Sequence, residues 1–294
     1  MAPPSDPRPR LAARPCPPLD PARRRRLTPM ALVSAAFLQL VQEFGNRLEL
    51  LGQVLARLHH LPRRKRWILD QFYVGGVQTF HVVLLVGLFM GMIVALQTGV
   101  ELARLGQQDQ IGMIVALSMA REMGPFTTGI VLSATVGSAL AAELGTMSVS
   151  DELSALEVLS VDIVSFLVLP RVFALAIICP ALTIICDAIG IWGGGFVAES
   201  QLHVSWSLYA DGALDALRKP GQLIPLPIEI YSGLMKAFVF GLLISVISCA
   251  SGLKARGGAL GVGQATRQAV RDSIIAIIVS NYFMTWFIQQ MEMR

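Results

Sequence analysis

Five long stretches of this sequence contain almost no charged side chains, and this pattern restricts the fold more than any other feature. They cover residues 71–100, 110–142, 172–198, 230–253 and 273–290, and the only charges inside them are Arg121, Glu122, Asp187 and Lys236. A helix that crosses a bilayer needs roughly 20 mostly apolar residues. A soluble protein can bury one such helix, but five in one chain indicate an all-α integral membrane protein with five transmembrane helices.

Composition and charge distribution agree with this interpretation. Charged residues make up only 15% of the chain, whereas soluble domains carry about 25%. Of the 24 Lys and Arg residues, 13 lie within 1–70. Cytoplasmic segments of membrane proteins carry an excess of these residues, so we expect the N-terminus and the segments 143–171 and 251–272 to be cytoplasmic. No basic fold with interleaved aromatic residues follows the basic N-terminus, so we expect no nucleic-acid partner.

The N-terminal part of the chain differs from the rest. Residues 1–29 hold nine of the sixteen prolines, and we expect a disordered cytoplasmic tail there; its few Ser residues argue against a plastid transit peptide. Over 30–73 the sequence predicts an amphipathic helix and then a short interfacial helix that leads into the first span. This amphipathic helix lies on the membrane or packs on a partner helix, and periodicity does not distinguish the two. Its predicted apolar stripe consists of Phe37, Leu40, Phe44, Leu48, Leu51, Leu55 and Leu58. The five-span domain then covers 74–294.

Two spans carry small residues at a spacing of four. One set is Gly87 and Gly91, and the other is Ser133, Gly137 and Ala141. Such spacing lets helix backbones approach closely in lipid. These residues therefore predict tight helix packing, and they also suit a seam between two copies of the chain.

The segment between the second and third spans is polar in its centre. Ser150 precedes acidic residues, as a helix N-cap would, and acidic groups suit the start of a helix. We therefore expect a short cytoplasmic amphipathic helix near 148–163, which either closes the loop or docks on a cytoplasmic partner. Its acidic residues are Asp151, Glu152, Glu157 and Asp162, and its leucines are Leu153, Leu156 and Leu159.

This polar segment belongs to a longer stretch, 138–171, that reads SALAAELGTMSVSDELSALEVLSVDIVSFLVLPR. Other motifs occur before and after it: GLFMGM at 87–92, REMGP at 121–125, GIWGG at 190–194 and GGALGVG at 257–263. Together, and in this order, they resemble the MlaE (YrbE) permease family of MCE-type lipid transporters over roughly 63–290. The chain departs from the family pattern at Asp151 and Glu152, where Glu-Gln is usual, at Ser160, where Gly is common, and at Ile163, where Pro is frequent.

The resemblance implies an MlaE-type ABC permease fold and a lipid-transport function. It implies a homodimer, a dimer of cytoplasmic ATPase subunits that use ATP and Mg, and a periplasmic MCE-domain protein. The cargo would be a phospholipid or a related lipid, and the location would be a bacterial inner membrane. In this interpretation Asp151, Glu152, Leu153, Leu156 and Glu157 form the helix that couples to the ATPase.

The charges inside the spans are the candidates for contact with a lipid headgroup. Each costs at least roughly 2.5–3.5 kcal/mol in a membrane unless it is paired or solvated. Arg121 and Glu122 are adjacent, so they project about 100° apart on a helix and one of them must meet another group. We expect Arg121, Glu122 and Lys236 to contact the lipid headgroup, with Lys236 near Glu122 or a phosphate. A purely structural polar network between helices is the alternative, and we expect Asp187 to have a structural role with a partner on a neighbouring helix.

No motif for catalysis is present. The glycines at 257–263 lack the P-loop pattern, the four cysteines form no C-x-x-C pair, and the histidines have no metal-ligand spacing. We therefore expect no enzyme activity, no metal and no bound cofactor in this chain. Two other functions remain open: an ATP-independent secondary transporter or channel, which would need a coupling-ion site and usually internal repeats, and a membrane-embedded lipid enzyme, which would need convergent catalytic residues.

Overall fold

The structure is a computed structural model, and it describes residues 42, 45–54, 56–57, 71–218 and 228–292. The chain divides into two units, Met1–Asn46 and Arg47–Arg294. The predicted tail at 1–29 and the basic residues at 63–66 lie outside the described residues. In the first unit the described residues, 42 and 45–46, are helical.

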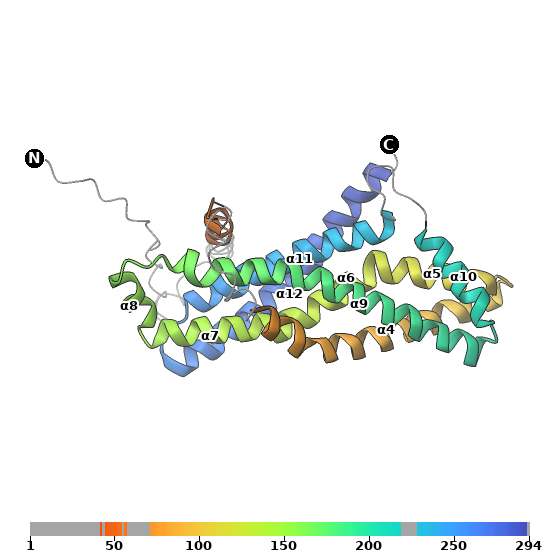
Figure 1. Ribbon diagram of the computed structural model, residues 1–294, viewed down its shortest axis with the longest axis horizontal. Helices are drawn as coiled ribbons and strands as arrows, with labels where there is room; N and C mark the ends of the chain where they lie inside the picture. The colour runs from red at the N-terminus through yellow and green to blue at the C-terminus, as the bar shows by residue number, and fades with distance from the viewer. Residues whose placement is uncertain (1–41, 43–44, 55, 58–70, 219–227, 293–294) are drawn as a thin grey trace, which may run out of the picture. The chain divides into compact units, whose positions relative to one another are not determined.

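In the described part of the second unit, every regular element is a helix and there are no strands (Figure 1). Four helical stretches are long and apolar enough to cross a membrane: Gly75–Arg104, Gln108–Val149, Val164–Leu202 and Glu229–Leu253. They overlap the first four predicted spans. The prediction of an all-α membrane protein is therefore confirmed.

Three of these stretches combine several helical elements, and the fourth is a single helix. The first consists of the π-helical turn η2 (Tyr73–Val77) and α4 (Gln78–Arg104). The second is a single rod of η3 (Gln108–Gln110), α5 (Ile111–Ser118), η4 (Met119–Met123), α6 (Gly124–Leu132), η5 (Ser133–Gly137) and α7 (Ser138–Val149). The third is η6 (Val164–Val168) with α9 (Leu169–Leu202), and the fourth is α11 (Ile228–Leu253). Two short helices, α8 (Glu152–Val158) and α10 (Trp206–Leu217), lie at opposite ends of the unit (Figure 1).

The fifth predicted span lies within the last helix, α12 (Gly258–Glu292). This helix has 35 residues, about 50 Å at 1.5 Å per residue, so its length suffices for a span. It is not among the four stretches that are apolar enough, because Asn281, Thr285, Gln289 and Gln290 interrupt its apolar run. The count of five spans therefore stays a prediction.

The predicted small-residue face of the first span packs against the third span of the same chain. A Cβ atom added at Gly91 would lie 2.5 Å from Gly190 Cα and closer still to the Gly190 carbonyl. A Cβ atom added at Gly87 would lie 2.8 Å from Cys186 Sγ. The backbones of α4 and α9 thus approach so closely that only glycine fits at these positions.

The second small-residue face packs against the fourth and last helices. A Cβ atom at Gly137 would meet Ser248 Oγ of α11 at 3.0 Å, and one at Gly252 would meet the Ala141 carbonyl oxygen at 2.9 Å. Ser133 is fully buried, and its hydroxyl donates to the Val270 carbonyl of α12 at 3.4 Å. Both faces are therefore occupied within one chain and do not form a seam with a second copy.

The helix around 45–57 buries a different stripe from the predicted one. Leu50 and Val54 are 6% and 3% exposed, whereas Leu48 is 52% exposed. Leu48 therefore faces away from the chain's own core, and a contact of the predicted stripe with the membrane or a partner helix stays a prediction. Leu51 is partly buried, and the other predicted members, at 37, 40, 44, 55 and 58, lie outside the described side chains. The sequence carries two overlapping apolar spacings here, and packing on the chain's own core selects the one through 50 and 54.

Candidate functional site

The second span contains a π-helical turn at the place where the sequence has its charged pair. This turn, η4, includes Arg121 and Glu122, and Gly124 and Pro125 follow it directly. Proline has no N–H, so Pro125 cannot donate to the carbonyl of Arg121 four residues earlier. That carbonyl instead accepts a hydrogen bond from Lys236 Nζ of α11 at 3.1 Å. The sequence from Arg121 to Pro125 thus widens the helix, and the Arg121 carbonyl oxygen accepts a hydrogen bond from another helix.

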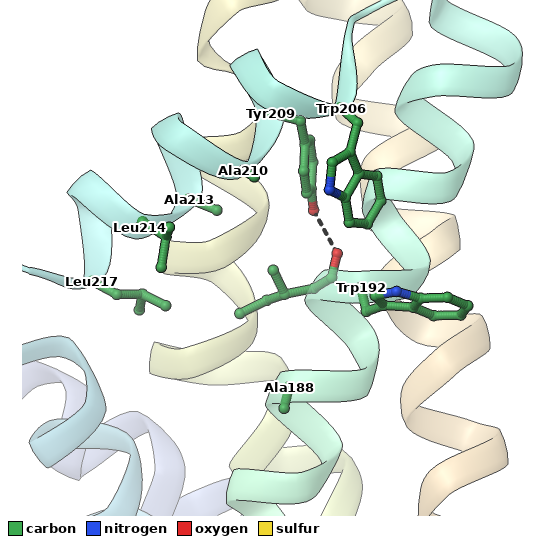
Figure 2. A pocket seen from close by; sticks show the side chains of 9 residues that line it. Ala188, Trp192, Trp206, Tyr209, Ala210, Ala213, Leu214 and Leu217 are labelled. Carbon is green, nitrogen blue, oxygen red and sulfur yellow. Dashed lines mark hydrogen bonds between the residues drawn. The ribbon is translucent and has the colours of Figure 1, made fainter.

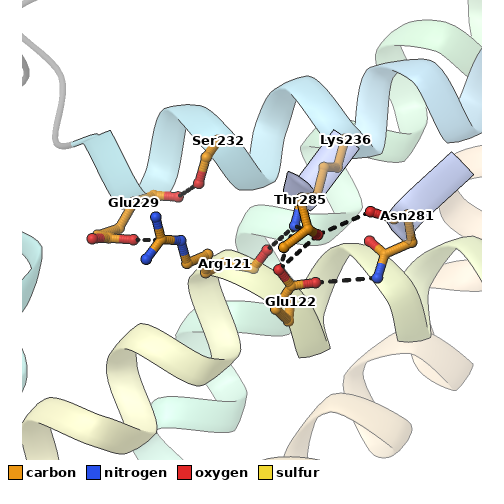
Figure 3. A network of polar contacts seen from close by, with 7 residues as sticks. All are labelled: Arg121, Glu122, Glu229, Ser232, Lys236, Asn281 and Thr285. Atoms are coloured by element: carbon orange, nitrogen blue, oxygen red, sulfur yellow. Dashed lines mark hydrogen bonds and ion pairs between the residues drawn. The ribbon is translucent and has the colours of Figure 1, made fainter. Parts of the chain in front are cut away.

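Lys236 and Glu122 form the centre of a polar network between three helices (Figure 3). Lys236 Nζ lies 2.5 Å from Glu122 Oε1 and donates to Thr285 Oγ1 at 2.8 Å. Thr285 Oγ1 lies 3.0 Å from Glu122 Oε1, and Asn281 Nδ2 donates to Glu122 Oε2 at 3.1 Å. An ammonium group has three N–H donors, so the contacts with Arg121, Glu122 and Thr285 use all three.

Accessibility differs sharply among the charged residues of this site. The side chain of Lys236 is 1% exposed and that of Glu122 is 29% exposed. Arg121, whose Nε lies 3.3 Å from Glu229 Oε2, is 28% exposed. Arg121 and Glu122 therefore reach the surface of the chain, and Lys236 supports them from within.

The sequence predicted that Lys236 meets either Glu122 or a phosphate, and the structure shows the contact with Glu122. The sequence did not single out the other partners. Asn281 and Thr285 are four residues apart and so lie on one face of α12. They are among the few polar residues in the last apolar run, and this was the signal that could have identified them. Glu229 lies in the first turn of α11, at the edge of an apolar run. A charge there usually needs no partner, so the sequence did not indicate its ion pair with Arg121.

In the part of the chain that the structure describes, Asp187 Oδ1 does not have the partner that we expected. This atom is buried and has no hydrogen-bond partner among the described residues. The atom occupies the space that a side chain at Gly124 would need. Asp187 therefore packs directly behind the turn that carries Arg121 and Glu122, and the expected interhelical pairing is wrong.

A helix, α8, lies at the predicted position of the coupling helix but is shorter than 148–163. Ser150 follows the end of α7, and its hydroxyl donates to the Thr146 carbonyl at 2.9 Å. The prediction that Ser150 caps α8 is therefore wrong. Asp151 has a left-handed backbone with φ of 59°, a conformation that Asp tolerates, and this residue turns the chain from α7 into α8.

The side chains of α8 and its flanking residues separate into a buried side and an exposed tip. Leu153 is buried and Leu156 is half-buried, whereas Asp151, Glu152 and Glu157 are exposed. Leu159 does not continue the buried leucine row, because α8 ends at Val158 and Ser160 reverses the chain with φ of 58°. Val158 and Leu159 are 85% and 71% exposed. An acidic surface with two apolar side chains therefore projects from this end of the unit.

The opposite end holds a small apolar hollow between α9 and α10 (Figure 2). Its volume is about 250 Å³, and Trp192, Trp206 and Leu214 are among the residues that line it. Tyr209 closes one side, where its hydroxyl donates to the Ile191 carbonyl at 2.9 Å. Burial raises the pKa of Tyr209, so this hydroxyl stays a neutral donor.

Comparison with known proteins assigns the chain to a family. The family model for the permease MlaE matches residues 68–287. The chain belongs to the MlaE permease family. A probable ABC transporter permease protein of Rickettsia bellii is 39% identical over 218 residues, which are 74% of this chain and 81% of that protein. The intermembrane phospholipid transport system permease protein MlaE of Haemophilus influenzae is 33% identical over the same shares of the two chains. The chloroplastic protein TRIGALACTOSYLDIACYLGLYCEROL 1 of Arabidopsis thaliana is 37% identical over 239 residues, or 81% of this chain and 66% of that protein.

This MlaE-family match includes all the elements that build the polar network. It contains the turn η4, the whole of α11 and the part of α12 that carries Asn281 and Thr285. It also contains α8 with its acidic surface. In the described residues no group of three or more His, Cys, Asp or Glu side chains could hold a metal ion.

Proposed function

We propose that this chain is the membrane permease subunit of an ABC transporter that moves phospholipid or a related lipid between membranes. It would work as two copies in a bacterial inner membrane, with its N-terminus in the cytoplasm. A cytoplasmic ATPase dimer would supply the energy with ATP and Mg, and an MCE-domain protein would receive or deliver the lipid on the periplasmic side. The printed name of the Haemophilus influenzae relative, which specifies intermembrane phospholipid transport, supports the cargo.

The observation that carries this proposal is the charged network of Arg121, Glu122 and Lys236 inside apolar helices. Unpaired charges at membrane depth are costly, and charges in spans mark substrate pathways by default. Arg121 and Glu122 are both more than a quarter exposed, so a ligand can reach them from the surface of the chain. A phosphate carries acceptor oxygens that suit a guanidinium fork, and an ammonium or hydroxyl headgroup suits the Glu122 carboxylate.

Lys236 takes a supporting role in this proposal. Its three N–H donors are already used within the chain, and a phosphate would have to displace Glu122 to contact it. Arg121 is therefore the cation that meets the headgroup first. Lys236 holds the Glu122 carboxylate and the Arg121 carbonyl in place.

Variants of the network test the headgroup site in the complete reconstituted complex. Lys236→Ala leaves the Glu122 carboxylate without its cation, which in a buried pair costs about 3–5 kcal/mol, so assembly must be checked first. The double variant Glu122→Gln/Lys236→Met removes both charges and keeps the side-chain shapes. We expect Glu122→Ala, Lys236→Ala and the double variant to transfer lipid much more slowly than the parent.

Arg104→Ala is the matched control, because Arg104 pairs with Glu101 on the surface, with side chains 71% and 64% exposed. We expect this variant to transfer lipid at the parental rate. If correctly assembled Glu122→Ala and Lys236→Ala variants also transfer lipid at the parental rate, the headgroup site is wrong.

The acidic surface of α8 is the proposed docking site for the ATPase. Asp151, Glu152 and Glu157 offer negative charge, and the exposed Val158 and Leu159 offer apolar area. A basic groove with an apolar floor would complement both. Hydrolysis would take place in the partner, and this chain would contribute only the contact.

Charge reversal tests the docking site. We expect Glu152→Lys or Glu157→Lys to reduce the amount of ATPase that co-purifies with the chain. Glu199→Lys makes the same charge change at an exposed position at the far end of α9, and we expect it to leave co-purification unchanged. Full co-purification and normal coupled ATP hydrolysis in both α8 variants would contradict the docking site.

A further inference from the structure

The helical segment from residue 47 to residue 57 ends in an arginine on each side, and both arginines are paired with distant parts of the chain. Arg47 forms an ion pair with Asp272 of α12. Arg57 Nε lies 2.7 Å from Asp162 Oδ2, in the loop that follows α8. One short segment is thus attached to two places that are about 110 residues apart in the sequence.

Apolar side chains that lie between Arg47 and Arg57 in the sequence pack this segment against the rest of the chain. Leu50 and Val54 belong to a buried cluster that includes Leu153 of α8 and Leu144 of α7. The same cluster contains Ile163, the residue after Asp162. The segment therefore shares a buried cluster with Leu153 of α8 and, through Arg57, contacts the loop that follows α8.

The other arginine reaches the helix that completes the polar network. Asp272 is 10% exposed, and Arg271 also pairs with it at 3.0 Å. Nine residues further along α12, Asn281 donates to Glu122, and Thr285 is one turn beyond. A regular helix joins these points, so a rotation or shift of α12 at Asp272 is carried to the Glu122 site.

We propose that Arg47 and Arg57 are positioning residues that connect the ATPase-docking helix α8 to α12, and through α12 to the Glu122–Lys236 network. This inference rests on the proposed function, because it takes α8 as the place where the ATPase acts. The segment 47–57 holds the loop after α8 and the part of α12 around Asp272 in one fixed relation. A movement of α8 during the ATPase cycle is therefore transmitted to the site of the lipid headgroup.

A charge-exchange experiment in the complete reconstituted complex tests the connection. The variants are Arg57→Glu, Asp162→Arg and the double variant with both changes, and the measured quantity is lipid transferred per ATP hydrolysed. We expect each single variant to retain the ATPase and to lower this ratio by about fivefold, the equivalent of about 1 kcal/mol for a partly exposed pair. The double variant restores opposite charges, and we expect it to recover most of the ratio.

Two further variants serve as controls. Arg57→Lys keeps the charge, and we expect a ratio near that of the parent. Arg104→Glu breaks the exposed pair with Glu101 at the opposite end of the unit, and we expect no change. Single variants that keep the parental ratio, or a double variant that does no better than the singles, would overturn the connection.

Hydrogen exchange in the purified chain gives a readout that does not depend on ATP. We expect Arg57→Glu to speed exchange of the backbone amides in 153–161 and the double variant to slow it again. If the parent complex shows no ATP-dependent lipid transfer, the proposed function fails, and this measurement still decides whether Arg57 positions α8. Unchanged exchange in Arg57→Glu would then contradict the positioning role.

Discussion

The contact between the first and third spans makes Gly91 sensitive to even a small substitution. In Gly91→Ala the new Cβ atom would lie 2.5 Å from Gly190 Cα, and ordinary contacts begin at 3.4 Å, so the two backbones would have to separate by at least about 0.9 Å. The obstructing atoms are backbone atoms, and no rotamer change can relieve the overlap. Overpacking of this kind costs about 1–3 kcal/mol, and a rigid obstacle places the cost near the upper end.

A gain in helix propensity offsets part of this cost. Alanine is about 0.5–1 kcal/mol better than glycine inside a helix. The net expectation for Gly91→Ala is therefore a loss of about 2 kcal/mol in the free energy of unfolding. Gly263→Ala is the matched control, because a Cβ atom added at this helical glycine of α12 would meet no atom within 4 Å. Gly263→Ala gains the higher helix propensity of alanine without an overpacking cost, so we expect this control to be slightly more stable than the parent.

Equilibrium unfolding of the purified chain in mixed micelles measures both variants on one scale. The expected order of unfolding midpoints is Gly263→Ala, then the parent, then Gly91→Ala. A midpoint for Gly91→Ala at or above that of the parent would show that α4 and α9 do not pack backbone against backbone. Equal midpoints for the two variants would lead to the same conclusion.

Three other changes have expected outcomes in the same assay. Ser160→Gly removes a side chain from a left-handed residue with φ of 58° and should raise the stability by about 1 kcal/mol, whereas a loss would mean that the Ser160 side chain is needed. Tyr209→Phe removes the hydrogen bond to the Ile191 carbonyl and should lower the stability by about 1 kcal/mol. A midpoint at the parental value would show that this hydrogen bond does not contribute to stability. Asp187→Asn keeps the shape of a side chain whose Oδ1 has no partner among the described residues, so its midpoint should equal or exceed that of the parent; a clear decrease would show that the carboxyl group itself is required.

The class of fold could be predicted from sequence because it depends on local composition. A run of 20 or more apolar residues has few stable environments other than a membrane or a core, whatever the rest of the chain does. The charged pair at Arg121 and Glu122 could be singled out for the same reason, since a charge is conspicuous in an apolar run. Lys236 was conspicuous in the same way. The cost of leaving charges unpaired was enough to predict that it meets an anionic group, with Glu122 and a phosphate as the two candidates.

Several features depended on contacts that the local sequence does not specify. Glu122 binds Asn281 and Thr285 only because α12 packs beside the second span, about 160 residues later in the chain. The buried stripe of the segment 47–57 is selected by the core that it covers, and its own periodicity allowed two answers.

Backbone geometry and packing determined the remaining features of the fold. Ser150 has the residue type and the acidic followers of an N-cap, yet the chain turns one residue later, at the left-handed Asp151. The small residues of the first two spans predicted close packing, and the structure shows that their partners are helices of the same chain. The sequence by itself therefore determined the membrane environment, the charged residues and the family. The tertiary structure decided which side chains meet, because contact requires particular helices at particular depths, and that arrangement is a property of the whole packed chain.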